Sequence, residues 1–360
     1  MDAVDRLWAA NARTAAPEHL AELLAQCTLA GADGVAAAAG FADPAFEWAT
    51  PRVAALADAW IARAAGPGRG ALDAGRFLHI CRRRVLPYFA DGARRTERWR
   101  AHPQSVGAFG WALARLDGAA AAGAVGAALP VLVSLLASDD AWAQRHGLRL
   151  AAVLAARAPA FVRASGVGGV LEERVHACLV FRSDAERGAE LLAAAFDAGF
   201  ALADTRAHTA APLWRLADRL VANAAYAGDR VRVLRVLAAQ VPRLAARLGV
   251  AVARHLRALV GVLAAPLRVP ARAPEMVGLH GELAAHLCAL ARACPARMRL
   301  YVDEAVAALT CAWAGAADAA LQQRLRDAMA CMRALDAPRV RRAAERLDRA
   351  RPGQLAGLIA

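Results

Sequence analysis

Apolar residues recur at three- and four-residue spacing along almost the whole chain, and this spacing is the feature that most constrains the fold. Runs that alternate apolar and polar residues between turn residues, which would indicate β-strands, are nearly absent. Clusters of Gly, Pro, Asp and Ser interrupt the helical spacing about every three to five helical turns. The sequence therefore predicts an all-α protein.

These interruptions place about sixteen helices along the chain. Their predicted ranges are 3–13, 17–30, 51–65, 71–90, 104–116, 119–137, 140–157, 168–181, 186–203, 210–226, 230–247, 250–264, 274–293, 297–314, 317–335 and 337–350. So many helices joined by short turns exceed what one closed bundle holds. We therefore expect an α-solenoid of the HEAT or armadillo type.

The clearest repeat unit covers Leu129–Arg157. Its first helix contains Pro130, its turn contains Asp139 and Asp140, and its second helix carries Arg145 and a stripe of Ala and Leu. An aspartate in such a turn can accept hydrogen bonds from the free backbone N–H groups of the second helix, and small alanines let the two helices approach closely. The unit resembles a HEAT repeat.

Weaker copies of this unit follow it, whereas the pattern before residue 118 is less regular and richer in Gly and Pro. We expect an N-terminal helical portion, residues 1–117, and a HEAT-like repeat array, residues 118–360, in one continuous solenoid. The first residues lack the apolar segment of a secretory signal. The uncharged stretch 118–138 is long enough to span a membrane, but acidic residues flank it and half of it is Ala and Gly, so a buried helix explains it better.

The chain carries a formal net charge of +13, and all 45 of its basic residues are arginine. Two interpretations stay open: a solvated surface shaped by a genomic bias against lysine, and a footprint for nucleic acid or an acidic partner. The densest basic segments are Arg82–Arg84 and Arg339–Gly353, and in the second one Glu345 and Asp348 can pair with arginines at helical spacing. Seven scattered cysteines without a CxxC pair favour a reducing compartment.

No constellation of catalytic residues stands out. Phosphate-loop, nucleophile-elbow and HExxH motifs are absent, and the glycine-rich segment 166–169 lies between two predicted helices rather than after a strand. His280, His286, Cys288 and Cys294 come nearest to a metal cluster, but helical spacing puts them on different sides, which favours core residues over ligands. Other histidines have no acidic or cysteine neighbour in the sequence that suggests a proton relay: His79, His146, His176 and His255. We expect no enzyme activity, no cofactor and no metal.

Five segments of the sequence are informative when they are taken together in their order along the chain. They are RVLPYF (84–89), WRAHPQSVGAFGWALARL (99–116), the repeat unit that begins at Leu129, FVRASGVGGVLEERVHACLVF (161–181) and ACPARMRLYVDEAVAALTCAW (293–313). In this order they resemble the Tel-two-interacting protein two family, the smaller helical-repeat subunit of the Triple-T (TTT) co-chaperone assembly. The resemblance covers roughly residues 80–320. One departure is Pro295, which directly follows Cys294 where the family has an intervening tryptophan.

The resemblance implies a non-enzymatic adaptor in the cytoplasm and nucleus. Such a protein joins larger helical-repeat subunits and helps phosphatidylinositol-3-kinase-related kinases, the TOR, ATM and ATR class, to mature with the Hsp-ninety machinery, without a membrane or nucleic-acid partner. Candidate residues of the interface or of the fold motif are Arg163, Gly166, Arg297, Tyr301 and Trp313. Two alternatives stay open: a HEAT-like nucleic-acid-binding or DNA-repair protein, and a generic trafficking solenoid.

Overall fold

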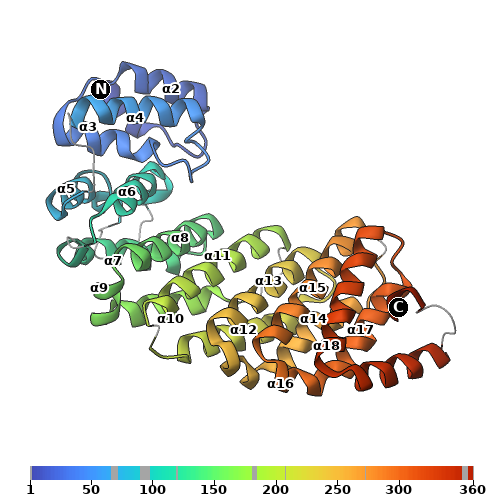
Figure 1. The fold of residues 1–360 in the computed structure, drawn as a ribbon. Coiled ribbons are helices and arrows are strands. Elements are labelled where there is room, and N and C mark those ends of the chain that lie inside the picture. The colour runs from blue at the N-terminus through green and yellow to red at the C-terminus, as the bar shows by residue number, and fades with distance from the viewer. Residues whose placement is uncertain are drawn as a thin grey trace. The chain divides into compact units, whose positions relative to one another are not determined.

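The computed structural model describes residues 2–65, 72–89, 98–118, 121–180, 185–206, 208–271, 273–350 and 356–359. Within these residues the regular elements are helices (Figure 1), and an isolated β-bridge joins Leu72 and Leu116. The predicted all-α solenoid class is confirmed.

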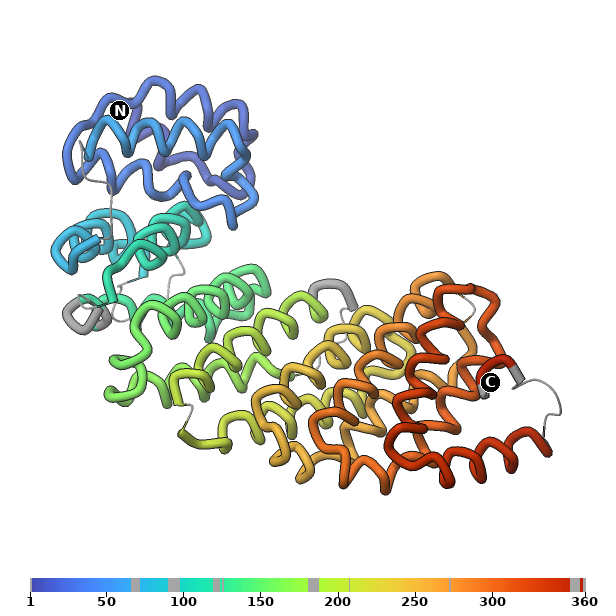
Figure 2. Tube along the Cα trace, in the orientation of Figure 1, coloured from blue at the N-terminus to red at the C-terminus, as the bar shows by residue number. Residues whose placement is uncertain are grey.

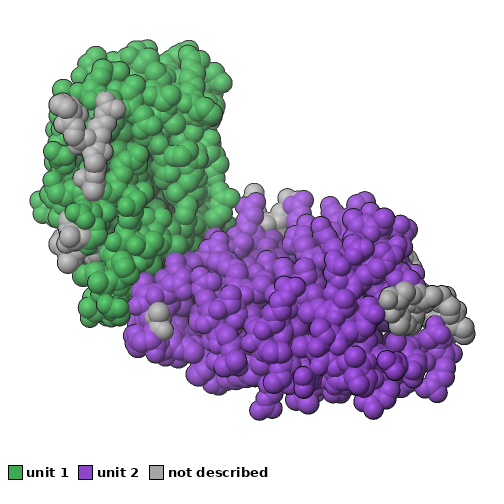
Figure 3. Space-filling model, viewed as in Figure 1, with its two compact units in different colours: residues 1–175 green, residues 176–360 purple. Residues whose placement is uncertain are grey.

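The chain divides into two compact units, residues 1–175 and residues 176–360, which are coloured separately in Figure 3. Helix α10, Val167–Cys178, crosses this boundary. The division that we expect from the sequence lies between residues 117 and 118, and it stays a prediction, as does the single continuous solenoid. The two units are described separately below.

Unit 1 consists of paired helices and three short 3-10 helices. Their bounds are α1 Ala3–Ala9, α2 Pro17–Gln26, α3 Gly31–Ala38, η1 Ala39–Phe41, α4 Pro51–Ala65, α5 Ala74–Arg84, η2 Leu86–Tyr88, η3 Arg98–Arg100, α6 Gln104–Arg115, α7 Ala121–Ala137, α8 Ala141–Arg157 and α9 Pro159–Ala164. Neighbours in the chain pair with each other, as α3 does with α4 and α7 with α8. Helix α5 also packs on α3 and α7, and α6 packs on α8, so each pair stacks on the next.

Unit 2 is a two-layered stack (Figures 1 and 2). Its elements are α11 Ala185–Asp204, α12 Ala211–Ala227, α13 Val231–Leu248, η4 Gly249–Arg254, α14 Leu256–Leu267, α15 Pro274–Ala293, α16 Pro295–Met298, η5 Arg299–Tyr301, α17 Val302–Ala314, α18 Ala319–Ala350 and α19 Ala356–Ile359. One layer contains α11, α13, α15 and α18, and the other contains α12, α14 and α17. Contact between every second helix is the arrangement that a helical-repeat stack requires.

Arginines of α13 bind side chains of α11 in the first layer of unit 2. Arg247 donates two hydrogen bonds to the carboxylate of Asp204, at 2.9 and 3.0 Å, and Arg243 donates one to Asp197 at 2.6 Å. Both guanidinium groups also lie over the ring of Phe200, 4.3 and 4.7 Å from its centre. Charge pairing and cation–π contact therefore act together between neighbouring repeats.

One segment among the described residues, Val231–Arg254, is long and apolar enough to cross a membrane by length and composition. It contains α13, whose buried side chains Val233, Leu237 and Val241 face the core of unit 2. The core helix of a helical-repeat protein meets the same criterion. The uncharged stretch 118–138 corresponds largely to α7, whose leucines Leu132 and Leu135 are fully buried, as expected from the sequence.

The predicted repeat unit forms the α7–α8 pair. The side chain of Asp140 accepts a hydrogen bond from the Trp142 backbone N–H at 2.8 Å, which confirms the predicted cap of the second helix. Gly147 lies at a close approach of the two helices. A Cβ atom there would be 2.9 Å from the Cβ of Leu135 and 3.2 Å from the backbone nitrogen of Leu136, so α8 requires a residue without a side chain at this position.

The predicted boundaries differ from the structure at several helices. Helix α3 is missing from the prediction because its alanine-rich segment contains a single large apolar residue, Val35, and therefore shows no clear period. Helix α5 ends at Arg84, before the 3-10 turn that contains Pro87; residues 71 and 90, the predicted limits, lie outside the described residues. The predicted helix 297–314 splits into α16, η5 and α17. The last two predicted helices, 317–335 and 337–350, both lie within α18, and the non-helical backbone of Asp336 separates them as predicted.

Candidate interaction sites

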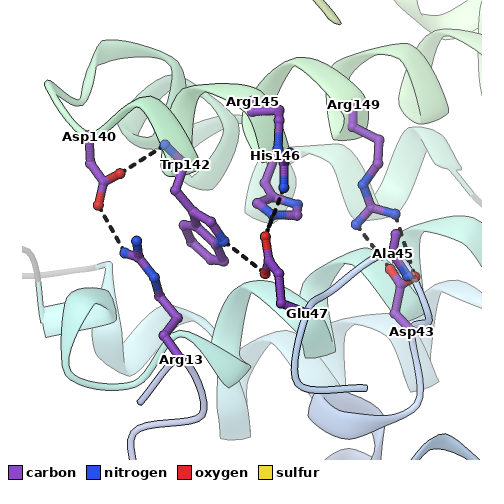
Figure 4. Close-up of polar contacts among 9 residues, drawn as sticks. All are labelled: Arg13, Asp43, Ala45, Glu47, Asp140, Trp142, Arg145, His146 and Arg149. Carbon is purple, nitrogen blue, oxygen red and sulfur yellow. Dashed lines mark hydrogen bonds and ion pairs between the residues drawn. The ribbon is translucent and has the colours of Figure 1, made fainter. Parts of the chain in front are cut away.

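A polar and aromatic cluster joins the loop between η1 and α4 to α8 in unit 1 (Figure 4). The loop supplies three side chains and α8 supplies four. We call this cluster the α8 clamp; its members are Asp43, Phe46, Glu47, Trp142, Arg145, His146 and Arg149.

Two loop carboxylates hold the clamp together. The carboxylate of Glu47 accepts hydrogen bonds from the indole Nε1 of Trp142 at 3.0 Å and from the guanidinium of Arg145 at 2.7 Å. Asp43, whose side chain is 11% exposed, accepts one from Arg149 at 3.0 Å. Hydrogen bonds between charged groups are shorter and stronger than neutral ones, so these contacts fix the loop against α8.

His146 occupies the centre of the clamp and is 2% exposed. Its ring stacks on Phe46, with centres 4.4 Å apart and planes 13° apart, and touches Trp142 at the same distance. The Nε2 atom lies 3.8 Å from the Glu47 carboxylate, too far for a hydrogen bond, and neither ring nitrogen has a hydrogen-bond partner among the described residues. Burial lowers the pKa of His146, so the ring is neutral at pH 7.

Glu47 is charged, in contrast to the neutral His146. Hydrogen bonds to the Glu47 carboxylate, one of them from the Trp142 indole, hold the pKa of Glu47 well below its usual value, so this carboxylate stays ionised across the physiological range. A neutral histidine beside an ionised glutamate, both fixed by packing, is a structural contact between loop and helix. The side chains of Glu47 and Arg145 are 53% and 36% exposed.

Replacing His146 with phenylalanine is expected to make unit 1 less sensitive to acid. Burial lowers the pKa of His146 in the folded chain, so the unfolded chain takes up the proton first, and stability falls as the pH drops through about 6.5, by at most about 1.4 kcal/mol per pH unit. Phenylalanine keeps the stacking but removes this proton. Denaturant unfolding between pH 7.5 and 5 measures the effect, and equal pH slopes for both proteins would contradict it. Protonation of Glu47 also lowers stability, but at a lower pH, between about 4.5 and 2.

The sequence shows no acidic neighbour for His79, His146 and His255, but each of them has one in the folded chain. The interpretation that these histidines lack acidic neighbours was therefore wrong. His146 lies beside Glu47, as described above. The Nε2 of His79 is 3.1 Å from a carboxylate oxygen of Asp33, and the Nε2 of His255 is 2.8 Å from Asp218. These pairs link residues 46 and 37 positions apart, and no local spacing rule finds them.

A cavity of about 480 Å³ opens on unit 1 among α3, α4, α5 and α6. Its buried apolar surface comes from Ile61, Leu72, Ile80 and Trp111. Charged side chains stand at its rim: Asp58, Arg76, His79 and Arg115. The guanidinium of Arg115 lies over the ring of Trp111, 4.4 Å from its centre. No local pattern in the sequence indicates this cavity, because its walls come from four separate helices and one of them, α3, is missing from the predicted helices.

Two of the candidate residues from the sequence lie in unit 1. Arg163 is exposed near the end of α9, and Gly166 is exposed in the turn that leads to α10. A Cβ atom at Gly166 would meet nothing within 4 Å, whereas one at Gly168 would lie 2.5 Å from the carbonyl oxygen of Val162. The glycine that the close approach of α10 to α9 requires is therefore Gly168, within α10.

The other three candidates lie in unit 2. Arg297 is exposed on α16, and Tyr301 is half-buried at the end of η5. The half-buried ring of Trp313 lies 5.2 Å from the guanidinium carbon of Arg326, and a Cβ atom on Gly357 would lie 3.0 Å from the ring. Trp313 thus packs against α18 and α19. The structure places the five candidates in two separate units, and their roles at an interface stay predictions.

The basic segments use several of their arginines inside the fold. The Nε atom of Arg83 donates a hydrogen bond to Asp33 at 2.9 Å. In the C-terminal segment, Arg339 donates one to Asp303 at 3.0 Å, and Arg346 lies 3.4 Å from the same carboxylate; residues 351–353 are outside the described part of the chain. These partners belong to other helices, and the expected pairing of Glu345 and Asp348 with arginines of their own helix stays a prediction.

The histidine and cysteine residues near α15 form no ligand set. His280 is fully buried, and its Nε2 lies 3.1 Å from the carbonyl oxygen of Pro266. Burial raises the pKa of the Cys288 thiol to about 12, so it is protonated at neutral pH. Across the described residues there is no group of three or more His, Cys, Asp or Glu side chains that could hold a metal ion.

Comparison with known proteins gives one family. The Tti2 family matches residues 69–273, more than half of the chain. A search of curated proteins gives no match. Among solved structures, an engineered protein from the Northeast Structural Genomics Consortium is 17% identical, with a TM-score of 0.34 over 100% of this chain and 97% of that one; a likeness of this size supports no argument. The family match extends from just before α5 to beyond α14, and this chain belongs to the Tti2 family.

Proposed function

We propose that this protein is a non-enzymatic scaffold subunit of a TTT-like co-chaperone complex and supports the maturation and stability of phosphatidylinositol-3-kinase-related kinases. The observation that carries this proposal is the family match over residues 69–273. Its direct partners would be the larger helical-repeat subunits of the complex, through which it would reach the kinases and the Hsp-ninety machinery. It would act in the cytoplasm and nucleus.

The architecture supports a role in binding. Stacked helix pairs present extended surfaces to other proteins, and both units of this chain are such stacks. The titratable groups with the clearest shifts serve packing: His146 is neutral in the α8 clamp, and burial raises the pKa values of the Cys81 and Cys288 thiols to about 12. Thiols with such pKa values are poor nucleophiles at neutral pH.

Affinity purification from the native cell tests the proposal. The tagged chain is recovered at moderate salt after nuclease treatment, and mass spectrometry identifies the proteins that remain bound. We expect large helical-repeat proteins together with kinases of the TOR and ATM class. Recovery of nucleic-acid-binding proteins that disappear with nuclease would favour the alternative raised by the +13 charge, and unrelated cargo would favour a trafficking solenoid. Either result would contradict the proposal.

Replacing Arg297 with glutamate is expected to reduce recovery of the partner subunits about tenfold or more. Arg297 is exposed on α16 within a segment that resembles the family, and it makes no ion pair with a described residue. A charge reversal there should leave stability within about 0.5 kcal/mol but repel a partner carboxylate. Arg52→Glu, at an exposed arginine of α4 outside the segments that resemble the family, is the matched control. Equal recovery with both variants would remove Arg297 from the interface.

A further inference from the structure

The cavity of unit 1 has the form of a docking site because small residues keep it open. Gly31 and Ala32 begin α3, while Ala64 and Ala65 end α4, and all four line the opening. Larger side chains at these positions would fill the space. At about 480 Å³ the cavity holds two or three amino-acid side chains.

The inner surface of the cavity suits an apolar side chain. Ile61, Ile80 and Trp111 are nearly inaccessible to solvent in the folded chain, and Val35 lies beside them, half-buried. A leucine or phenylalanine that entered the cavity would lose contact with water on most of its surface, which is the main source of affinity in such sites.

The rim of the cavity suits a carboxylate. Arg115 is an exposed residue whose guanidinium lies over the Trp111 ring, and it makes no ion pair with any described carboxylate. Other arginines of unit 1 in similar surroundings are paired, as Arg149 is with Asp43. A guanidinium has five N–H donors and prefers to bind carboxylates through two of them. Arg115 therefore keeps donors available that an incoming acidic group can use.

A second arginine adds to this charge. Arg76, also on the rim, is 61% exposed and is held only loosely by Asp73, at 3.8 Å. Among the described residues that line the cavity, Asp58 is the acidic one, and it is exposed. In this described lining two arginines stand against one aspartate, and the contact of Arg76 with Asp73 is longer than a hydrogen bond, so complementarity favours an acidic partner.

The same geometry favours a protein segment over a nucleic acid. Single-stranded nucleic acids bind by stacking bases on open aromatic faces. The ring of Trp111 is 4% exposed and Arg115 covers it, so it offers no such face. An apolar interior with a cationic rim fits alternating acidic and apolar side chains better.

From these observations we propose that the cavity among α3, α4, α5 and α6 binds an acidic and apolar segment of a partner protein, with a carboxylate on Arg115 and an apolar side chain inside. The proposal rests on the proposed function only in taking the chain to be a protein-binding scaffold. It adds to the family assignment a specific surface and the chemistry of its ligand.

Titration of the purified full-length chain with two peptides tests this site. The acidic probe is acetyl-Asp-Leu-Asp-Leu-amide, and the neutral probe has asparagine in place of both aspartates. We expect isothermal titration calorimetry to show that the acidic peptide binds. The affinity for the neutral peptide should be at least about tenfold lower, since a hydrogen bond to a charged group contributes on this scale.

Three variants locate the binding. Arg115→Gln should weaken the acidic peptide about tenfold, and Ala32→Phe, at an exposed position of the opening, should block it while Arg115 stays intact. Arg52→Gln, an exposed arginine outside the cavity, should bind like the parent protein. Thermal unfolding of each variant shows that it is folded.

The proposal is overturned if neither peptide binds at concentrations up to about 10 mM, which is well above a Kd of about 1 mM, the weakest that we would count as specific binding. It is also overturned if both peptides bind equally, if Arg115→Gln has no effect, or if a poly-uridine oligonucleotide binds more tightly than the acidic peptide. These outcomes concern the site alone. The affinity purification described above tests membership of the complex, so failure of one proposal can be told from failure of the other.

Discussion

Replacing Gly107 with alanine is expected to lower the stability of unit 1 by about 3 kcal/mol, because the added methyl group has no space. Gly107 lies within α6, and a Cβ atom there would be 2.5 Å from the backbone carbonyl oxygen of Gly40 in η1. That oxygen already accepts a hydrogen bond from the indole of Trp48 at 3.0 Å. Helix and 3-10 turn would have to separate, which would loosen the buried packing around them.

The same substitution at Gly126 is the matched control and should have the opposite sign. Gly126 is an exposed position inside α7, and a Cβ atom there meets nothing within 4 Å. Alanine restricts the unfolded chain and favours the helix, which should add about 0.5–1 kcal/mol. The contrast between the two variants separates close helix contact from the general effect of removing a glycine.

Denaturant unfolding monitored by tryptophan fluorescence measures both variants. Six of the eight tryptophans lie in residues 1–175, so this signal reports mainly on unit 1. For a unit of this size, a loss of about 3 kcal/mol corresponds to a fall in Tm of roughly 6–12 °C. If Gly107→Ala were as stable as the parent protein, the close approach of α6 to η1 would be wrong.

Replacing Leu309 with alanine should destabilise unit 2 by about 2–5 kcal/mol. Leu309 is fully buried on α17, which packs on α14 and α18 in the two-layered stack. Alanine would leave a cavity between these helices that the repeats cannot close without shifting. Because partner surfaces of a helical-repeat protein depend on the register of its repeats, recovery of partner subunits should also fall.

Leu300 offers the matched control for this variant. It lies in η5, close to α17 in the chain, but 57% of its surface is exposed. Alanine there should change stability by no more than about 0.5 kcal/mol. Hydrogen exchange followed by mass spectrometry assigns the loss to α14, α17 and α18 in the Leu309 variant. Similar exchange in the two variants would show that burial of Leu309 does not stabilise the stack.

Local patterns predicted the helices well where the apolar spacing was clear. The repeat unit of α7 and α8 is an example, since the Asp140 cap and the apolar stripe both lie within one short stretch of sequence. The pattern failed at α3, where alanine and glycine dominate. Alanine is compatible with a buried face and an exposed one, so its position carries little information about which side of a helix faces the core.

Contacts between distant segments lay outside the reach of sequence patterns. Glu47 and Trp142 are 95 residues apart, and nothing near either residue indicates that they meet in the α8 clamp. Arg115 looks like one of 45 arginines until the structure shows it unpaired at the rim of a cavity. Family segments in the right order indicated the Tti2 relationship, but they did not reveal which surface of the chain carries a site.

The sequence by itself determined that this protein is a stack of helices and to which family it belongs. Both conclusions depend on residues near one another in the chain, because helical period, caps and short motifs are local properties. The tertiary structure alone decided which side chains meet: the clamp on α8, the contact between Gly40 and Gly107, and the cavity among four helices. Such contacts depend on how the repeats stack, and stacking follows from the fit of many side chains at once.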